Sequence, residues 1–394
     1  MRDAYIVASI RTPGCKKGKG AFKETRPDDL LAFVLNAVVN KNKEINLNEI
    51  DDVIVGCAFP EAEQGLNIAR MSSKIAGFPD SIPGVTINRF CSAGLEAISL
   101  ASLKVMSGWC DIVIGAGVES MTYVPMGGNK PRPNPEYSEK DPSLYVSMGI
   151  TAENVAKRYN ISREDQDIFA YNSHMKASKA RDNNLFDEII STKGIRYNLD
   201  KEGLYEKEFF YQKNDDGIRP STTIEKLSRL SPVFSVGGSV TAGNSSQTTD
   251  GAAATLIMSK SALDRYGIKP LAKLKNYTVV GCKSDEMGIG PALAIPKLLE
   301  MSKLKVSDIG LWEINEAFAS QALYSIRSLG LQDKIEDINI HGGAIALGHP
   351  LGCTGAKLCS TLLANMRRYN KKYGVESMCI GGGMGAAALF ELCD

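Results

Sequence analysis

The chain of 394 residues lacks several features that would assign a function class directly. Its nine cysteines include no C-x-x-C pair, which argues against both a zinc site and a disulfide framework and favours a reducing compartment. No apolar run approaches the ~20 residues that a membrane-spanning helix needs. The formal net charge is only +1, so we expect no general attraction to nucleic acid or to an anionic membrane surface. An anionic ligand must therefore be recognised locally.

Two glycine-containing stretches fall short of nucleotide-binding motifs. Residues 348–357 end in Gly-Ala-Lys, so the Gly-Lys-Ser/Thr ending of a phosphate loop is missing. The pair Gly115 and Gly117 lacks a third glycine and is too weak to indicate a dinucleotide site. These stretches therefore predict neither a phosphate loop nor a dinucleotide site. We expect no metal ion and no cofactor.

The composition that remains is typical of an α/β protein. Glycine is abundant, with 37 residues, and only 7% of the residues are aromatic. Residues 52–58 and 111–117 read as buried strands, and helical sequence alternates with strands of this kind, which predicts a layered α/β domain. Residues 121–247 interrupt the pattern. Within them Ser162 is a good N-cap for a helix over 163–183, whereas the charged stretch 197–216 shows little periodicity.

The later half of the chain repeats the earlier half in outline. Residues 311–318 match 54–59 as a strand that leads into a helix, and residues 378–384 match 112–118. This repetition predicts two duplicated α/β halves with a site where they meet, although similarity this weak can also arise by chance. The predicted domains are an N-terminal half at 1–120 completed by about 248–270, an inserted loop domain at 121–247, and a C-terminal half at 271–394.

Cys91 lies where a short strand at 84–87 gives way to a helix that continues to Ser107. The free N–H groups at the beginning of a helix favour negative charge, so we expect them to lower the pKa of this thiol from about 8.5 towards neutrality. The alternative is a small core cysteine, because free cysteine is among the most buried residue types. The far end of the chain decides between these interpretations.

Four stretches together resemble the thiolase family. They read NRFCSAGLEA at 88–97, NEAFA at 315–319, GGAIALGHPLGCTG at 342–355 and CIGGGMG at 379–385. Further similarity at 11–13, 148–154 and 238–246 extends the resemblance over nearly the whole chain. The sequences at 288–291 and 351–355 are most similar to those of degradative 3-ketoacyl-CoA thiolases. The resemblance implies the thiolase fold, in which two α/β halves form a layered αβαβα core that carries an inserted loop domain. It also implies acetyl-CoA C-acyltransferase activity through an acyl-cysteine intermediate.

The resemblance implies a role for each catalytic residue. Cys91 would be the acylated nucleophile, and His349 would activate it and then help to hold an oxyanion. Asn315 would position a water in the same oxyanion hole. Cys379 would protonate the acetyl-CoA enolate and deprotonate incoming CoA, and the backbone N–H groups of Cys91 and Gly381 would form a second oxyanion hole. Taken alone, His349 could be a turn histidine and Cys379 a core cysteine.

The resemblance also places the substrate. Ser246 would contact the pantetheine arm and Arg219 a phosphate of CoA, although Arg219 could instead be a solvated side chain. The residues implied to line the acyl pocket are Met148, Met287 and Phe318. Short-chain biosynthetic thiolases carry a histidine before the loop methionine, whereas Ser147 stands here, which puts acetoacetyl-CoA specificity in doubt. His174 and His341 are interpreted as structural.

The expected ligands are acyl-CoA substrates and CoA itself, and the expected assembly is a homodimer or homotetramer that associates with other β-oxidation enzymes. The chain opens on a strand-like sequence with no room for a signal peptide and ends without a peroxisomal address, so we predict a cytoplasmic protein. Three alternatives stay open: an acetoacetyl-CoA thiolase working in the condensation direction, a decarboxylating condensing enzyme, and a non-catalytic acyl-CoA binding protein.

Overall fold

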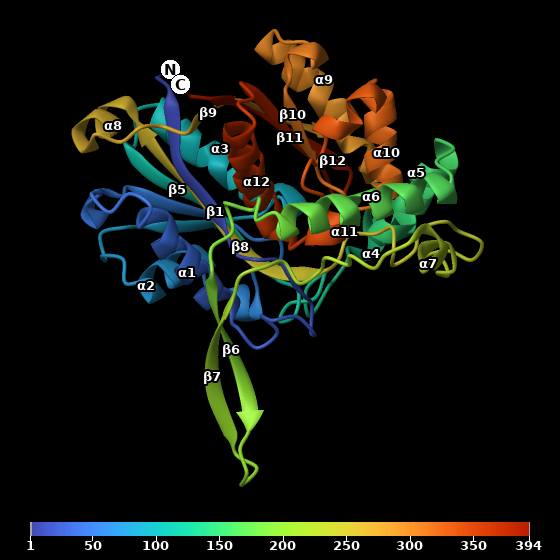
Figure 1. Ribbon diagram of the computed structural model, residues 1–394, viewed down its shortest axis with the longest axis horizontal. Coiled ribbons are helices and arrows are strands. Elements are labelled where there is room, and N and C mark those ends of the chain that lie inside the picture. Colours follow the sequence, from blue (N-terminus) through green and yellow to red (C-terminus); the bar gives the residue numbers. More distant parts are fainter. Residues whose placement is uncertain (1, 394) are drawn as a thin grey trace.

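A computed structural model describes residues 2–393 of the chain (Figure 1). The strands are β1 (Ala4–Arg11), β2 (Cys15–Lys16), β3 (Asp52–Gly56), β4 (Gly84–Ile87), β5 (Ile112–Ser120), β6 (Thr192–Leu199), β7 (Tyr205–Gln212), β8 (Thr249–Ser259), β9 (Ala272–Gly281), β10 (Leu311–Ile314), β11 (Tyr373–Ile380) and β12 (Met384–Leu392). The helices are α1 (Pro27–Val39), α2 (Ile68–Ile75), α3 (Ala93–Met106), α4 (Pro135–Lys140), α5 (Met148–Arg158), α6 (Arg163–Asp182), α7 (Ile224–Ser228), α8 (Lys260–Tyr266), α9 (Gly290–Ser302), α10 (Ala319–Ser328), α11 (Ala344–Leu347) and α12 (Thr354–Arg368).

The main sheet consists of two equivalent half-sheets. Its strand order is β10-β11-β12-β9-β1-β8-β5-β3-β4, with β2 paired to β8 beside this path. In the first half β3 runs parallel to β5 and β5 antiparallel to β8; in the second half β10 runs parallel to β11 and β11 antiparallel to β12. The halves are joined between β1 and β9 by two residue pairs, Tyr5 with Lys273 and Ile6 with Ala272. The predicted duplication is therefore confirmed.

Helices α3 and α12 form the central layer between the two half-sheets (Figure 1). Their buried side chains, among them Ile98 and Leu362, share one apolar cluster with Val113 of β5 and Met378 of β11. Helices α1 and α2 cover the outer face of the first half-sheet, and α9 and α10 cover that of the second. The order is helix, sheet, helix, sheet, helix, as the resemblance implied.

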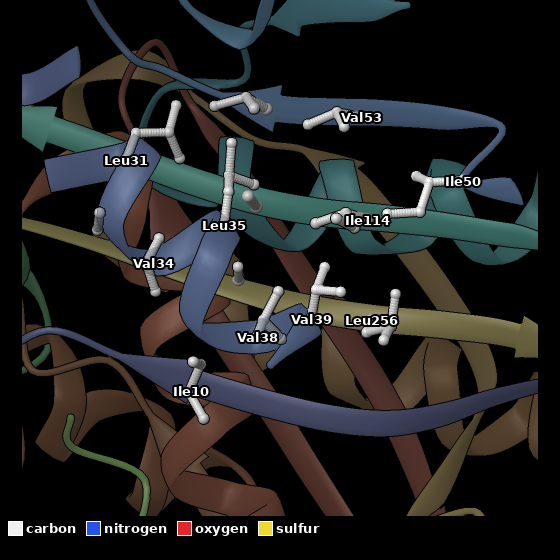
Figure 2. Packing of buried hydrophobic residues seen from close by; sticks show 14 of the residues in the cluster. Ile10, Leu31, Val34, Leu35, Val38, Val39, Ile50, Val53, Ile114 and Leu256 are labelled. Carbon is white, nitrogen blue, oxygen red and sulfur yellow. The ribbon is translucent and has the colours of Figure 1, made fainter. Parts of the chain in front are cut away.

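The spacing of the apolar residues in α1 explains how it packs. Figure 2 shows Leu31, Val34, Leu35 and Val38, which recur every three or four residues and so lie on one helix face towards the sheet. They contact strand residues such as Ile114, and removing each such side chain from water contributes about 1.5–3 kcal/mol. Pro27 occupies the first turn, where its missing N–H costs no helical hydrogen bond.

Residues 121–247 hold α4 to α7 and a hairpin of β6 and β7. The side chain of Ser162 accepts a hydrogen bond from the N–H of Asp165 at 3.1 Å, so the predicted N-cap is confirmed. The hairpin projects from the body of the molecule (Figure 1) and was not predicted. Eight residue pairs join β6 to β7, and most of their side chains are exposed on both faces, which hides the alternation by which a half-buried strand is found. That residues 121–247 form a separate domain stays a prediction.

None of the helices within residues 2–393 is long and apolar enough to cross a membrane.

Candidate active site

One cavity brings together residues from both halves of the chain. Its lining consists of Cys91, Met121, Met126, Met148, Ser246, Thr248, Met287, Ala317, Phe318, His349, Leu351 and Cys379. Seven of the ten residues named from the sequence are in this lining. Asn315 and Gly381 are adjacent to it through contacts with His349 and Cys91, whereas Arg219 lies outside.

Cys91 sits in a tight turn between β4 and α3. A 3₁₀ turn over Phe90–Ser92 precedes the helix, and Phe90 has a φ of 43°, which is strained for a residue with a side chain. Asn88 holds this turn, because its Oδ1 accepts the N–H of Phe90 at 2.8 Å and its Nδ2 donates to the carbonyl of Ala58 at 3.0 Å. The turn presents the Cys91 sulfur to the cavity with only 7% of the residue exposed.

The prediction that the helix terminus lowers the pKa of Cys91 is wrong for the free protein. Burial raises the pKa of the Cys91 thiol to about 11, although hydrogen bonds from the backbone N–H groups of Gly381 and of Cys91 itself act in the opposite direction. Desolvation of the thiolate outweighs these donors. The resting residue is therefore a neutral thiol, and two backbone N–H groups are directed at its sulfur.

His349 lines the same cavity as Cys91. Its Nε2 lies 3.5 Å from Nδ2 of Asn315, and its Nδ1 lies 2.5 Å from Oγ1 of Thr354. Burial, with a smaller contribution from the charge of Lys357, lowers the pKa of His349 to about 3. The imidazole is consequently neutral at physiological pH and has a lone pair available for a proton.

The backbone around His349 is held from several directions. Gly348 has a φ of 83°, and a Cβ there would lie 2.3 Å from Cγ2 of Thr249, so this position needs glycine on two counts. The N–H of His349 donates to the carbonyl of Gln247 at 2.9 Å. This bond joins the loop that carries His349 to the segment that carries Ser246.

Two buried carboxylates fix the ends of the same loop. Glu316 accepts hydrogen bonds from the Ser173 hydroxyl at 2.6 Å, the Asn339 amide at 2.9 Å and the N–H of Ile345 at 3.2 Å. Glu119 accepts the N–H of Gly352 at 2.8 Å. Burial raises the pKa of both carboxyl groups, although their hydrogen bonds oppose the rise.

Glu119 also connects the two halves of the chain. It accepts the N–H of Ala58 at 2.8 Å and the side-chain amide of Gln64 at 2.7 Å, both from the first half, in addition to Gly352 from the second. A single carboxylate therefore sets the distance between the end of β3 and the turn that follows His349. This tie stabilises the relative placement of the Cys91 and His349 segments.

Cys379 lies near the end of β11 and is completely buried. Burial raises its pKa well above that of an exposed thiol, and a negative charge on nearby Cys91 would raise it further. The turn after β11 contains Gly381, where a Cβ would lie 3.3 Å from the sulfur of Met148, and Gly382, which has a φ of 83°. The glycines bring the backbone close to the cavity, so the protonated thiol of Cys379 and the N–H of Gly381 lie near the Cys91 sulfur.

Asn315 follows β10 and is buried. Its Oδ1 has no hydrogen-bond partner within residues 2–393, so it is available to a small polar molecule beside His349. This arrangement agrees with the implied role of holding a water, and that role stays a prediction.

The residues named for substrate binding divide into two groups. Ser246, Met148, Met287 and Phe318 line the cavity. Arg219 is exposed, and its backbone N–H donates to Nδ1 of His174 at 3.3 Å.

The two remaining histidines are accounted for by packing. His341 lies 3.1 Å from the hydroxyl of Tyr369 and has an edge-on contact with Phe186, and His174 accepts the backbone bond just described. Both lie outside the lining of the cavity, as their structural interpretation expected.

Several residues of the site were not found from the sequence. Met121 and Met126 line the cavity from the segment after β5, and Thr354, Glu119 and Glu316 act through hydrogen bonds. Glu316 was inside a quoted motif but received no role. The spacing of residues in the sequence does not indicate a role for them. Each contacts a segment that is distant along the chain, or one that comes close only because the chain turns back. Within residues 2–393 no cluster of His, Cys, Asp and Glu side chains is suited to hold a metal ion.

Comparison with known proteins agrees with this architecture. The thiolase N-terminal domain matches residues 4–261 and the thiolase C-terminal domain matches residues 268–392. The 3-ketoacyl-CoA thiolase of Bacillus subtilis (strain 168) is 50% identical over 395 residues, which cover 100% of each chain. The peroxisomal 3-ketoacyl-CoA thiolase of Homo sapiens is 45% identical over 394 residues, which cover 99% of this chain and 91% of the human one.

Solved structures have the same fold. The dimeric peroxisomal thiolase of Saccharomyces cerevisiae aligns with a TM-score of 0.88 at 40% identity and covers 100% of this chain and 98% of its own. The Bacillus anthracis acetyl-CoA acetyltransferase aligns with a TM-score of 0.88 at 36% identity, and the alignment covers 100% of this chain and 99% of the other. By class the protein is an acyltransferase enzyme. The chain belongs to the thiolase family.

Proposed function

We propose that the protein is a 3-ketoacyl-CoA thiolase of fatty acid β-oxidation, which cleaves a 3-ketoacyl-CoA with CoA into acetyl-CoA and an acyl-CoA two carbons shorter. The observation that carries this proposal is the single cavity lined by Cys91, His349 and Cys379. Two thiols and a neutral imidazole together supply the nucleophile, the base and the acid that the cleavage needs. The names of the full-length relatives support the same reaction.

In the first half-reaction His349 Nε2 takes the proton of Cys91, and the thiolate attacks C3 of the substrate. The C2–C3 bond then breaks, the acyl group stays on Cys91 as a thioester, and the acetyl-CoA enolate leaves with the bonding electrons. Cys379 donates its proton to C2 of this enolate. The high pKa of both buried thiols suits these steps, because each must hold its proton until the substrate takes part.

In the second half-reaction the Cys379 thiolate deprotonates CoA, whose sulfur attacks the acyl group. The tetrahedral intermediate expels Cys91, which recovers its proton from His349. The N–H groups of Gly381 and Cys91, directed at the Cys91 sulfur, would hold the alkoxide on the carbon that this sulfur attacks, and the imidazolium with an Asn315-bound water would hold the enolate oxygen. Coenzyme A acts here as a substrate, and the proposal includes no cofactor.

The substrate would extend from the cavity across the segment that carries Ser246. Arg219 is exposed, and its segment contacts that of Ser246, because Nε2 of Gln247 donates to the carbonyl of Gly217 at 3.0 Å; its guanidinium would meet a phosphate of CoA. Arg219→Ala should raise KM for CoA while kcat changes little, because a phosphate contact far from the reacting atoms binds ground state and transition state alike. An unchanged KM would exclude Arg219 from CoA binding.

The acyl chain would meet a flexible lining. Four methionines, Met121, Met126, Met148 and Met287, face the cavity, and methionine changes rotamer readily to admit a longer chain. Each buried methylene contributes up to about 0.8 kcal/mol, so kcat/KM should rise over the first few carbons. We expect 3-ketohexanoyl-CoA and 3-ketooctanoyl-CoA to be cleaved at least as well as acetoacetyl-CoA.

The second candidate is an acetoacetyl-CoA thiolase that works in the condensation direction, which the fold similarity to an acetyl-CoA acetyltransferase favours. Steady-state thiolysis with C4 to C16 substrates separates the two. Strong cleavage of acetoacetyl-CoA with no cleavage of C6 and C8 substrates would replace the first proposal by the second.

We also propose a homodimer formed through β4. This strand ends the main sheet, and large apolar side chains are exposed on it and beside it: Val85 is 40% exposed, Leu66 87%, and Met71 and Ile75 of α2 are 39% and 51%. The dimeric yeast thiolase supports this assembly. Light scattering at micromolar concentration should give twice the chain mass. In Val85→Lys the measured mass should fall to that of the monomer. A monomeric unmodified protein would contradict the proposal.

We further propose that the protein is cytoplasmic and associates with other β-oxidation enzymes. A homotetramer is the alternative assembly.

A further inference from the structure

The contacts of Thr354 determine which nitrogen of His349 carries the proton. Thr354 is the first residue of α12, and its hydroxyl donates to the carbonyl of Pro350 at 3.0 Å. The same oxygen lies 2.5 Å from Nδ1 of His349. A hydroxyl has one proton, so an oxygen that donates it to Pro350 can only accept from the imidazole. This geometry favours the tautomer of His349 with the proton on Nδ1.

The other side of the ring gives an independent indication. Nε2 of His349 faces the amide nitrogen Nδ2 of Asn315 at 3.5 Å. If Nε2 carried the proton, its N–H would point at the Asn315 amide N–H₂, which is also a donor. An unprotonated Nε2 can instead accept a hydrogen bond from that amide. The tautomer with the proton on Nδ1 satisfies both contacts. The opposite tautomer satisfies neither the donor at Asn315 nor the bond from Thr354 to Pro350.

We propose that Thr354 is a positioning residue that holds His349 as the Nδ1–H tautomer, so that Nε2 keeps a lone pair that can leave its long contact with Asn315 and accept the proton of Cys91. This inference rests on the proposed function for the roles of Cys91 and His349. In the step itself the S–H bond of Cys91 breaks, an N–H bond forms at Nε2, and the Nδ1–H bond to Thr354 stays intact.

A hydroxyl partner has a different effect from a carboxylate partner. It orients the ring and selects the tautomer, but it adds no negative charge that would stabilise the imidazolium before substrate arrives. The groups that face or adjoin the ring are the neutral thiols of Cys91 and Cys379 and the amide of Asn315, and Lys357 on α12 adds a positive charge nearby. The resting pair of Cys91 and His349 is thus thiol and imidazole, and charge separation occurs only when the substrate carbonyl is in place.

Thr354→Ser and Thr354→Val form a matched pair that tests this role. Serine keeps the oxygen that accepts from Nδ1, whereas valine keeps the shape and removes the oxygen. Thr361→Val is the control, because Thr361 lies on the same helix and also uses its hydroxyl in a buried hydrogen bond, at 2.9 Å to Glu188, away from the cavity. We expect kcat to fall roughly 10-fold to 100-fold in Thr354→Val and less than about 3-fold in Thr354→Ser, with KM little changed in both.

The tautomer can be observed without substrate. The chain has three histidines, so selective ¹⁵N-histidine labelling gives few signals, and the signals of His349 are assigned by their loss in His349→Gln. Long-range proton–nitrogen correlation should show a protonated Nδ1 and an unprotonated Nε2 in the unmodified protein and in Thr354→Ser. In Thr354→Val we expect a substantial population with the proton on Nε2.

A protonated Nε2 in the unmodified protein overturns the inference, even where Thr354→Val does not fold. A folded Thr354→Val that keeps both the Nδ1–H signal and the original kcat also overturns it. The spectrum requires no turnover, so it is independent of the proposed function, which fails instead if the unmodified protein cleaves no 3-ketoacyl-CoA.

Discussion

The two halves of the chain share a strand order but supply different groups to the cavity. In the first half the turn before the central helix α3 carries Cys91; in the second half the equivalent 3₁₀ turn, Leu351–Cys353, precedes α12 and has Gly352 in the matching place. A Cβ at Gly352 would lie 2.5 Å from the backbone nitrogen of Ala58, so this turn has no room for a second nucleophile. The two halves therefore share one backbone arrangement, and local differences in their turns decide which side chains reach the cavity.

The ends of the equivalent strands differ in the same way. β3 is followed by Cys57, which lies in the apolar core against Glu119, whereas β10 is followed by Asn315, which contacts His349. β11 continues to Cys379 and its glycine turn; Cys379 lines the cavity with Cys91, and the N–H of Gly381 is directed at the Cys91 sulfur. The active site is asymmetric although the fold that carries it is nearly symmetric.

Removal of the Cys91 thiol, which the first half contributes, should have the largest effect on kcat for thiolysis. Cys91→Ala abolishes covalent catalysis, and we expect thiolysis to fall by roughly 10⁴-fold or more in kcat. Cys359→Ala is the matched control, since Cys359 is a buried cysteine of α12 outside the cavity, and its kcat should stay within about 3-fold of the original. Comparable turnover in Cys91→Ala and in the control would contradict the assignment.

Replacement of the thiol that the second half contributes should have the next largest effect. In Cys379→Ser the shape is kept, but an alcohol is a far weaker acid, so proton transfer to the enolate should slow by roughly 10²–10⁴-fold. Transfer of an acetyl group from acetyl-CoA to Cys91 should partly survive, because His349 serves that step. Turnover equal to that of the unmodified enzyme would refute the acid/base role.

A change at Glu316 tests how the histidine loop is held. In Glu316→Gln one amide N–H₂ must face a donor among Ser173, Asn339 and the N–H of Ile345, and an unsatisfied buried donor costs about 1–3 kcal/mol of unfolding free energy. We expect this loss in urea denaturation and a roughly 10-fold lower kcat, because His349 shifts with its loop. Glu336→Gln, an exposed acid nearby, is the control. If both variants resemble the unmodified protein, Glu316 does not hold the loop.

The pH dependence of alkylation tests the resting state of Cys91. Because burial raises the pKa of Cys91 to about 11, the thiolate fraction should increase about 10-fold for each unit of pH below that value. The rate of alkylation by iodoacetamide at Cys91, followed by peptide mass spectrometry, should therefore rise roughly 100-fold from pH 7 to pH 9. Glutathione serves as the reference thiol for the reagent. A plateau below pH 8 would show a thiolate–imidazolium pair instead.

The sequence alone was sufficient for the elements that a local pattern defines. The apolar spacing of α1, the N-cap at Ser162 and the two matching strand–turn–helix units each depend on neighbours along the chain. The motifs around Cys91, His349 and Cys379 also identified three residues that the structure brings into one cavity. Their roles follow from the resemblance and await the experiments above.

The parts that failed depend on three-dimensional surroundings. The pKa of Cys91 was mispredicted because the helix terminus is visible in the sequence, whereas the burial that outweighs it is not. Glu119 joins segments on both sides of the duplication, and its partners at Ala58 and Gly352 cannot be inferred from spacing. The contact of Thr354 with His349 is short in sequence, but it exists only because the turn between them folds back.

Mass spectrometry of the acylated enzyme tests most directly that the two halves divide the chemistry between Cys91 and Cys379. The unmodified protein and Cys379→Ser are incubated with acetyl-CoA, digested and analysed peptide by peptide. The account predicts the acetyl group on Cys91 in both proteins. Reproducible acetylation of Cys379 in the unmodified protein, with none on Cys91, would contradict it.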